Sequence, residues 1–436
     1  MKKTIYTFFI STILIHINFF TAFAQVQKEK DYSRNFEKNG IEKLIIIHQR
    51  GPLLLQKSTD GMIHLDLHVR ITGRNEEDIN TLFQSINLDD TKNGNELKIT
   101  SSTNIESWNQ ILHKTKIKLK SGALLTDIKD MEMIMTVQAP DLNLISLENK
   151  YEQIEVGTDL AGSLEINLYS GELYAGNIGG DLILNTKYSN LNFGKITNGH
   201  FDLYESKVSG KSAGDLRIQS KYSTLKLDGC HKMMVESYED KYTVGNIEET
   251  LAIDDKYSHF HLEDFGDAQL EMYETVFESV RGKNVTMDCK YGSFKAESLN
   301  ELQLSESYET DFTIGKLNTV VAQNDKYGSF EINHLTESFS INGYESSVNV
   351  NQVSTNFKLL NIDSKYDRMQ FGFPPDLHYS LDLEMKYGKI TLHEEGFANM
   401  NREEKGEQLK IKAGLDDPTR KAKVVIRSYE TDFILQ

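Results

Sequence analysis

Tyrosine recurs at a nearly constant interval over most of this chain, and this repetition restricts the possible folds more than any other sequence feature. Neighbouring members of the series lie 16 to 19 residues apart. A period of this length is typical of repeat proteins, in which each unit buries its apolar edge only by stacking on the next unit. The series comprises Tyr151, Tyr169, Tyr188, Tyr204, Tyr222, Tyr238, Tyr257, Tyr273, Tyr291, Tyr308, Tyr327 and Tyr344.

Two motifs alternate along the series. In the first, Lys precedes Tyr and an apolar residue follows three positions after the Tyr, as at Tyr188. In the second, Glu usually follows Tyr and the apolar residue comes four positions after the Tyr, as at Tyr204. Between the tyrosines, apolar residues such as Leu216 and Ile218 are spaced by two, which is the period of a β-strand.

These repeats predict an all-β fold. Each unit of about 17 residues holds two short strands separated by turn residues, such as Gly179-Gly180-Asp181. We therefore expect a parallel β-solenoid, either a single-stranded β-helix or a β-roll, with one unit per rung and about 13 rungs. In an alternative arrangement each unit forms half a turn, with the Lys-Tyr strands in one sheet and the Tyr-Glu strands in the other.

The two ends of the chain differ from the repeats. We predict an N-terminal, β-rich cap over residues 25–145, which protects the first rung from edge-to-edge pairing. Within this cap Asn75 offers an N-cap and apolar residues follow at helical spacing, so a helix is expected near residues 76–87. Residues 146–436 are expected to form the solenoid repeats and their C-terminal closing strands.

The extreme N-terminus has the features of a signal peptide over residues 1–24. Lys2 and Lys3 precede an apolar run that closes at Ala22-Phe23-Ala24, a small-large-small site of the kind that signal peptidase cleaves. We expect cleavage after Ala24 and export to the periplasm or the outer cell surface. No later segment resembles a membrane span, so the mature chain is not expected to be an integral membrane protein.

The net charge limits the choice of partner. Lys and Arg total 48 against 65 for Asp and Glu, which gives a formal net charge of −17. A chain with this charge repels a phosphate backbone, so nucleic acid and anionic lipid surfaces are not expected as partners.

The chain has two cysteines, Cys230 and Cys289. Their units are about four rungs apart in the expected stack, or roughly 19 Å at the usual strand spacing. A disulfide requires Cα atoms within about 7 Å. Both thiols are therefore expected to be free.

Several motifs together resemble a known family. The string Lys-Tyr-Gly/Ser-x-apolar is repeated, and Val137-Gln138-Ala139-Pro140-Asp141 leads into Leu144-x-x-Leu147 after a strand-turn-strand and short-helix module. This pattern is similar to that of the bacterial putative adhesin family over nearly the whole mature chain. The family's Ser-Gly-Asp-apolar motif is only approximated, by Ser170-Gly171-Glu172-Leu173 and Gly180-Asp181-Leu182. The resemblance implies a right-handed β-helix or β-roll in the envelope of Gram-negative bacteria and little about a ligand.

The Lys and Glu residues beside the tyrosines form the candidate binding surface. Because alternate rungs carry them, unlike charges approach diagonally within roughly 7–8 Å. In a structural interpretation these charges only fix the register of the rungs. In a functional interpretation the amphipathic Tyr rings grip a glycan or a peptide. The centre of this surface would comprise Lys187, Tyr188, Glu205, Lys221, Tyr222, Lys256 and Tyr257.

Two motifs of enzymes and metal proteins are interpreted as chance matches. Gly210-Lys211-Ser212-Ala213-Gly214 matches the G-x-S-x-G string, but a nucleophile elbow needs a strand, a sharp turn and a helix, and here the string occupies a repeat turn. His64, Asp66 and His68 share one face of a strand, but three polar groups on a solvated strand are not sufficient for a metal site. We therefore expect no catalytic residues, no metal and no cofactor.

The expected function is that of an exported, non-enzymatic, adhesin-like or scaffold protein of the cell envelope, which binds a glycan or another protein through its repetitive surface. Two alternatives stay open. One is a polysaccharide lyase on a β-helix, for which Asp, Arg and Lys would cluster in one groove. The other is a partner in envelope-stress signalling that docks to a membrane regulator. A flat aromatic stripe without such a cluster would favour binding.

Overall fold

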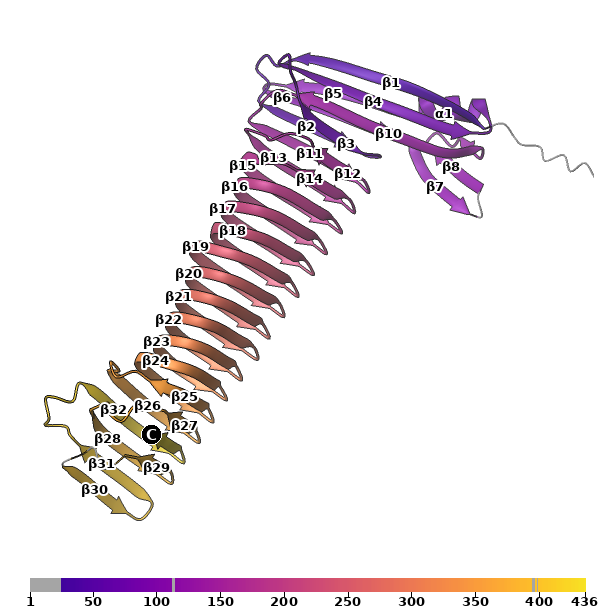
Figure 1. Cartoon of the computed structure of the whole chain (residues 1–436). Coiled ribbons are helices and arrows are strands. Elements are labelled where there is room, and N and C mark those ends of the chain that lie inside the picture. Colours follow the sequence, from indigo (N-terminus) through magenta and orange to yellow (C-terminus); the bar gives the residue numbers. More distant parts are fainter. Residues whose placement is uncertain (1–24, 112–113, 394–396, 398) are drawn as a thin grey trace, which may run out of the picture. The chain divides into compact units, whose positions relative to one another are not determined.

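The computed structural model describes residues 25–111, 114–393, 397 and 399–436. The described chain is nearly all-β, with strands β1 to β33 and one helix, which confirms the predicted fold class (Figure 1). It divides into two compact units. The first comprises residues 25–30, Val69–Ile86 and Thr103–Glu132, and the second comprises Asp31–His68, Asn87–Ser102 and Met133–Gln436. The predicted signal peptide and its cleavage site after Ala24 lie outside the described residues.

The first unit holds the helix and a small antiparallel sheet. Helix α1 spans Glu76–Gln84, and the Asn75 side chain accepts a hydrogen bond from the Glu77 amide at 2.9 Å, as an N-cap does. The helix ends a few residues earlier than predicted because the Ser85 hydroxyl and amide both donate to the Leu82 carbonyl. No helix in the described part of the chain has the length and hydropathy of a membrane span. The sheet comprises β7 (Ile105–Ile111), β8 (Lys114–Leu119) and β9 (Leu124–Leu125).

The parallel stack begins near the start of the second unit. β11 (Leu144–Lys150) pairs in parallel with β2 (Lys43–His48) on one side and with β13 (Ser163–Tyr169) on the other. In the same way β12 (Gln153–Val156) pairs with β3 (Leu53–Lys57). On their other sides β2 pairs in parallel with β6 (Glu96–Thr103) and β3 pairs in parallel with β10 (Ile128–Ala139), so parallel pairing starts within the range predicted as the cap. The other strands before β11 are β1 (Val26–Glu37), β4 (Met62–Gly73) and β5 (Ile86–Asn93).

Each following strand or strand pair forms one turn of the solenoid. Leu191 pairs with Val208, 17 residues on, and Tyr242 pairs with Phe260, 18 residues on. The solenoid has about 13 turns of about 18 residues, so one unit forms a whole turn and the half-turn alternative is wrong. The strands are β14 (Glu172–Ala175), β15 (Ile178–Lys187), β16 (Asn190–Tyr204), β17 (Lys207–Lys221), β18 (Thr224–Tyr238), β19 (Lys241–Lys256), β20 (His259–Tyr273), β21 (Val276–Lys290), β22 (Ser293–Tyr308), β23 (Asp311–Lys326), β24 (Ser329–Tyr344) and β25 (Ser347–Val353).

The core consists of inward-pointing columns of apolar side chains. Leu216 and Ile218 are buried, which confirms the inward direction that their spacing predicts. Phe312 and Phe330, on successive rungs, stack with ring centroids 4.7 Å apart. The column to which they belong is at most 3% exposed and comprises Leu191, Val208, Leu225, Tyr242, Phe260, Phe277, Phe294, Phe312, Phe330 and Val348.

The C-terminal end of the stack departs from the order of the sequence. β32 (Ala422–Tyr429) pairs in parallel with β26 (Leu359–Lys365) on one side and with β28 (Tyr379–Lys386) on the other. The last part of the chain is therefore inserted between two rungs that both precede it in sequence.

The neighbouring strands follow the same order. β33 (Asp432–Leu435) lies between β27 (Arg368–Phe371) and β29 (Lys389–Leu392). An antiparallel hairpin of β30 (Met400–Lys405) and β31 (Gln408–Ala413) pairs with β28 and closes the stack.

Both cysteines are buried and free, as expected. The backbone pairing leads from Cys230 through Ile247 and Phe265 to Gly282, three rungs away, on the strand that carries Cys289. Three rungs span about 14 Å at the usual strand spacing, which exceeds the reach of a disulfide. Burial raises the pKa of both thiols to about 12.

Candidate binding surface

One corner of the solenoid is built on residues in the left-handed backbone conformation. Among the described residues, fifteen non-glycine residues have φ between 45° and 68°, and all of them lie at this corner, whereas the positive-φ glycines lie elsewhere. This conformation costs a residue with a Cβ roughly 1–2 kcal/mol. The corner residues are Tyr151, Ser170, Tyr188, Glu205, Tyr222, Glu239, Tyr257, Glu274, Tyr291, Glu309, Tyr327, Glu345, Tyr366, Tyr387 and Glu430.

The two sequence motifs occupy alternate rungs at this corner. Backbone pairing places Tyr204 opposite Lys187 and Lys221. The corner residue that follows is Glu205 on this rung and Tyr222 on the next. One column therefore alternates between Lys and Tyr, and the adjacent left-handed column alternates between Tyr and Glu.

The tyrosines of both motifs form one continuous row, which we call the tyrosine ladder. Each ring contacts the next edge to face, with centroids 5.2 to 5.8 Å apart. Tyr429 of β32 lies between Tyr366 and Tyr387, so the ladder is unbroken at the inserted rung. In spatial order its members are Tyr151, Tyr169, Tyr188, Tyr204, Tyr222, Tyr238, Tyr257, Tyr273, Tyr291, Tyr308, Tyr327, Tyr344, Tyr366, Tyr429 and Tyr387.

The two kinds of tyrosine differ in exposure. Tyr188, Tyr222 and Tyr257, at left-handed positions, are 41% to 45% exposed. Tyr238, which belongs to a Tyr-Glu motif, is half-buried. A hydrogen bond to the neighbouring Glu239 raises the pKa of Tyr238. The exposed rings therefore recur on every second rung, with a carboxylate beside the half-buried ring between them.

All seven residues predicted as the centre of the binding surface lie along this corner. Lys187, Tyr188, Glu205, Lys221, Tyr222, Lys256 and Tyr257 fall within five consecutive rungs. In the described part of the chain no ion pair within 4.0 Å joins the lysines and glutamates of the two motifs. Their charges thus alternate along the corner without ion pairing. The nearby tyrosines supply other contacts, because Glu239 is hydrogen-bonded to Tyr238 and the Lys386 ammonium lies 4.7 Å from the centroid of the Tyr387 ring.

A second outward column runs beside the ladder, two positions before each Lys or Tyr of the strand. We call it the amide–carboxylate column. Asn185 donates to Asn167 at 3.0 Å, and Gln219 donates to Glu236 at 3.0 Å. Sequence reasoning missed this column, although its members stand at a fixed offset from the tyrosines. They are Glu148, Asn167, Asn185, Asp202, Gln219, Glu236, Asp254, Glu271, Asp288 and Glu306.

Inside the corner a column of side-chain oxygens satisfies the backbone. The amide of Ser189 donates to Ser206 Oγ at 3.3 Å, and the amide of Ser206 donates to Ser223 Oγ at 3.1 Å. The amide of Ser223 donates to the buried carboxylate of Asp240 at 2.5 Å. Buried amides require such partners. The interior of the corner is therefore fixed independently of the ladder outside it.

Asp367 is the buried acid next to the inserted C-terminal strands. Its Oδ1 accepts from the Ser346 amide at 2.7 Å, and its own amide donates to Thr431 Oγ1 at 3.3 Å. Its Oδ2 has no hydrogen-bond partner within the described residues. Burial, with a smaller contribution from the charge of Asp325, raises the pKa of Asp367 to about 7.

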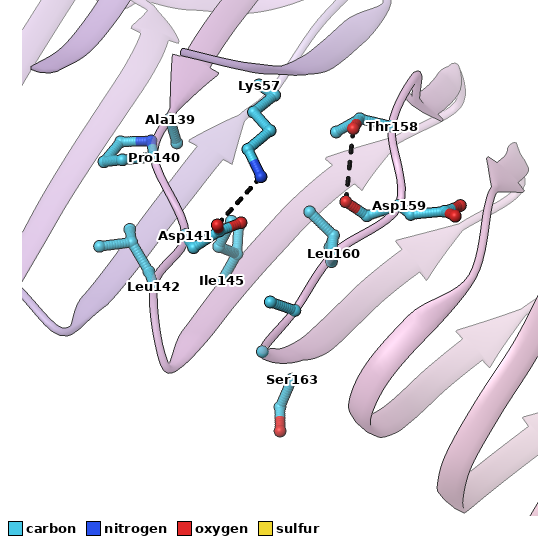
Figure 2. A pocket seen from close by; sticks show the side chains of 12 residues that line it. Lys57, Ala139, Pro140, Asp141, Leu142, Ile145, Thr158, Asp159, Leu160 and Ser163 are labelled. Atoms are coloured by element: carbon cyan, nitrogen blue, oxygen red, sulfur yellow. Dashed lines mark hydrogen bonds and ion pairs between the residues drawn. The ribbon is translucent and has the colours of Figure 1, made fainter. Parts of the chain in front are cut away.

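The cavity shown in Figure 2 is too small for a ligand. It is bordered by the ion pair of Lys57 with Asp141, at 2.9 Å, and by Thr158, whose hydroxyl donates to the Asp159 carbonyl at 3.3 Å. The cavity measures about 10 Å³, which is the space of a single water molecule.

The other motifs singled out from the sequence have local partners. His64 contacts Asn35 and Asp60, His68 contacts Asp31 at 2.7 Å, and the Ser33 hydroxyl donates to Asp66 at 2.6 Å. Among the described residues, no group of three or more His, Cys, Asp or Glu side chains has the geometry of a metal site. The G-x-S-x-G string lies within β17 and is followed by strand, without the helix that a nucleophile elbow requires.

Comparisons with known proteins give no family for the chain, because no protein-family model and no curated protein matches it. One similar solved structure is a putative adhesin from Bacteroides fragilis, with 16% identity and a TM-score of 0.23 over 68% of this chain and 97% of the other. A putative cell adhesion protein from Clostridium sporogenes has 8% identity and a TM-score of 0.18, over 94% and 99% of the two chains. A putative lipid binding protein from Parabacteroides distasonis has 12% identity and a TM-score of 0.21, over 68% and 96%. At these values the likeness carries no information on function.

Proposed function

We propose that the protein is a non-enzymatic, adhesin-like protein of the cell envelope that binds a glycan or another protein through the tyrosine ladder. The observation that carries this proposal is the choice of residues at the left-handed corner. Glycine adopts the left-handed conformation without steric cost. All fifteen positions nevertheless hold larger side chains, and all but one of them are Tyr or Glu.

Strained backbone conformations persist where the surrounding structure holds them in place, and they cluster at functional sites. At this corner the hydrogen bonds inside hold the backbone, because the amides of Ser189 and Ser206 bind the hydroxyls of the following rungs. The tyrosines outside are free to face a partner. Their rings present an apolar face, and their hydroxyls present a polar tip.

The experiment that tests this proposal removes three exposed rings from the centre of the ladder. We expect the variant with Tyr188→Ala, Tyr222→Ala and Tyr257→Ala to lose retention on a column of isolated envelope material, because it lacks the three exposed rings whose apolar faces would contact the partner. The measurement is the fraction of purified mature protein that the column retains, with circular dichroism to verify the fold.

A matched control is Tyr174→Ala. Tyr174 is 47% exposed and donates to Glu172 at 2.9 Å, but its ring is outside the ladder. This variant should be retained like the wild type. A triple variant that is folded and fully retained would rule out the ladder as the binding surface.

A further inference from the structure

We infer that the ligand of the tyrosine ladder is a neutral, extended β-linked polysaccharide whose disaccharide repeat spans two rungs of the solenoid. This inference rests on the proposed function and specifies its ligand. It follows from four properties of the corner: its period, its charges, its closed backbone and the column beside it.

The period of the exposed surface is two rungs. Tyr188, Tyr222 and Tyr257 stand on every second rung, and the rings between them are half-buried. Two rungs span about 9.6 Å at the usual strand spacing. In a cellulose-type chain, successive sugars are turned over, so that chemically equivalent ring faces recur once per disaccharide, over about the same length. Such a chain can place the same carbon-hydrogen face on each exposed ring.

The charges favour a neutral polymer. Each pair of rungs contributes one Lys, such as Lys221, and one Glu, such as Glu239, to the corner. On every repeat, a polycation would be repelled by the Lys and a polyanion by the Glu. The amide–carboxylate column adds five acids on successive rungs, from Glu236 to Glu306, which repel a polyanion further.

The same column supplies the polar contacts that a sugar requires. Its planar amide and carboxylate groups lie outward and beside the rings, and accept hydrogen bonds through oxygen. Asn185, Gln219 and Glu236 are exposed members of the column. Hydroxyl groups at the edge of a sugar ring donate to such acceptors while its face lies on a tyrosine. A row of rings with a parallel row of oxygen acceptors is thus complementary to a hydroxyl-rich chain.

The backbone of the corner is closed to a peptide strand. Recognition of an extended peptide by strand addition uses free main-chain donors and acceptors. Here the Tyr188 amide donates to the Tyr204 carbonyl at 3.0 Å, and the Glu205 amide donates to the Lys221 carbonyl at 2.9 Å. The main-chain amides and carbonyls along the ladder therefore already form hydrogen bonds between successive rungs, so a ligand must be recognised by the side chains.

The test is a calorimetric titration of the full mature chain with cello-oligosaccharides of increasing length, from the disaccharide to the hexasaccharide. Each added disaccharide covers one more exposed tyrosine, so the affinity should rise roughly three- to tenfold per added repeat. Two polymers serve as controls. Oligogalacturonate of equal length is anionic, and laminari-oligosaccharides carry the same sugar in a linkage that coils the chain. Both should bind at least tenfold more weakly than the cello-oligosaccharide of the same length.

Two double variants test whether the amide–carboxylate column contacts the oligosaccharide. Gln219→Ala combined with Glu236→Ala should weaken hexasaccharide binding about tenfold. The control pair Lys207→Ala and Lys241→Ala, on exposed positions of the strands that follow the corner, should leave it unchanged. An affinity that does not change with chain length, or that is equal for oligogalacturonate, overturns the inference. If the oligosaccharide test fails but the triple tyrosine variant still loses retention on envelope material, the proposed function is retained and only the assignment of the ligand class is rejected.

Discussion

A protein that ends at Lys421, without β32 and β33, is expected to lose the ordered structure of β28 to β31. The deleted segment carries Val424, Ile426, Phe433 and Leu435, each at most 1% exposed. Burial of one such side chain contributes roughly 1.5–3 kcal/mol, so their removal exceeds the stability that a terminal rung can supply. Because a solenoid is stabilised mainly between neighbouring turns, the turns before β26 should remain folded. Limited proteolysis with mass spectrometry should locate new cleavage sites within Tyr379–Ala413.

Two neighbouring residues of β33 provide a milder, matched test. Phe433 is 1% exposed and Ile434 is 37% exposed. Phe433→Ala should lower the free energy of unfolding by about 3–5 kcal/mol, whereas Ile434→Ala should have a much smaller effect.

For the chain that ends at Lys421, protease resistance of residues 379–413 would contradict the inserted position of β32 and β33.

The stability of the same end of the solenoid is expected to fall as the pH rises from about 4 to about 7. Burial raises the pKa of Asp367 from 3.8 to about 7. Between these two values the folded chain binds a proton that the unfolded chain releases, so the free energy of unfolding decreases with pH. At about 1.4 kcal/mol per pH unit, the loss is on the order of 4 kcal/mol. Burial also raises the pKa of Asp325, which accepts a hydrogen bond from Ser346 beside Asp367, and this adds to the change in the same direction.

The variant Asp367→Asn isolates this contribution. It should match the wild type near pH 4, where the acid is protonated, and should be more stable than the wild type near pH 8. Asp363→Asn, at an exposed position of β26, the strand that precedes Asp367, should keep the pH dependence of the wild type. Urea denaturation at several pH values measures the difference. Parallel pH profiles for Asp367→Asn and the wild type would exclude Asp367 as the titrating group.

The sequence was sufficient to predict the rung length and the inward columns. The tyrosines repeat about every 17 residues, which gives the rung length, and the apolar residues within each strand repeat every two residues, which gives the inward columns. It was not sufficient to predict the inserted strands, because the order of rungs depends on pairings between distant segments. A signal for the insertion was nevertheless present. Lys365-Tyr366 and Lys386-Tyr387 follow each other without a Tyr-Glu motif between them. Tyr429-Glu430 supplies the missing motif, and its insertion restores the alternation.

The candidate site was predicted in composition but not in geometry. In a regular strand, successive side chains point to opposite faces, so Tyr204 and Tyr222, one position apart in register, would be assigned to different faces. The left-handed conformation of Tyr222, with φ of 57°, breaks this alternation and brings both rings to one corner. Backbone dihedrals of this kind are unusual for non-glycine residues. The three- and four-residue spacings after the tyrosines show that the two kinds of tyrosine are offset by one position, but not that their rings meet at one corner. The continuous ladder could therefore be recognised only in the structure.

The measurement that tests the central claim most directly is the free energy of unfolding of a variant with Tyr188→Gly, Tyr222→Gly and Tyr257→Gly. If these rings are kept at strained positions for a ligand, the fold does not require them. Glycine relieves roughly 1–2 kcal/mol of strain at each of the three positions. This relief offsets most of the loss of six ring contacts, two for each tyrosine, at about 0.5–1.5 kcal/mol per contact. We therefore expect a free energy of unfolding within about 2 kcal/mol of the wild-type value. A loss of more than about 5 kcal/mol would show that the ladder exists to stabilise the solenoid, and would contradict the account.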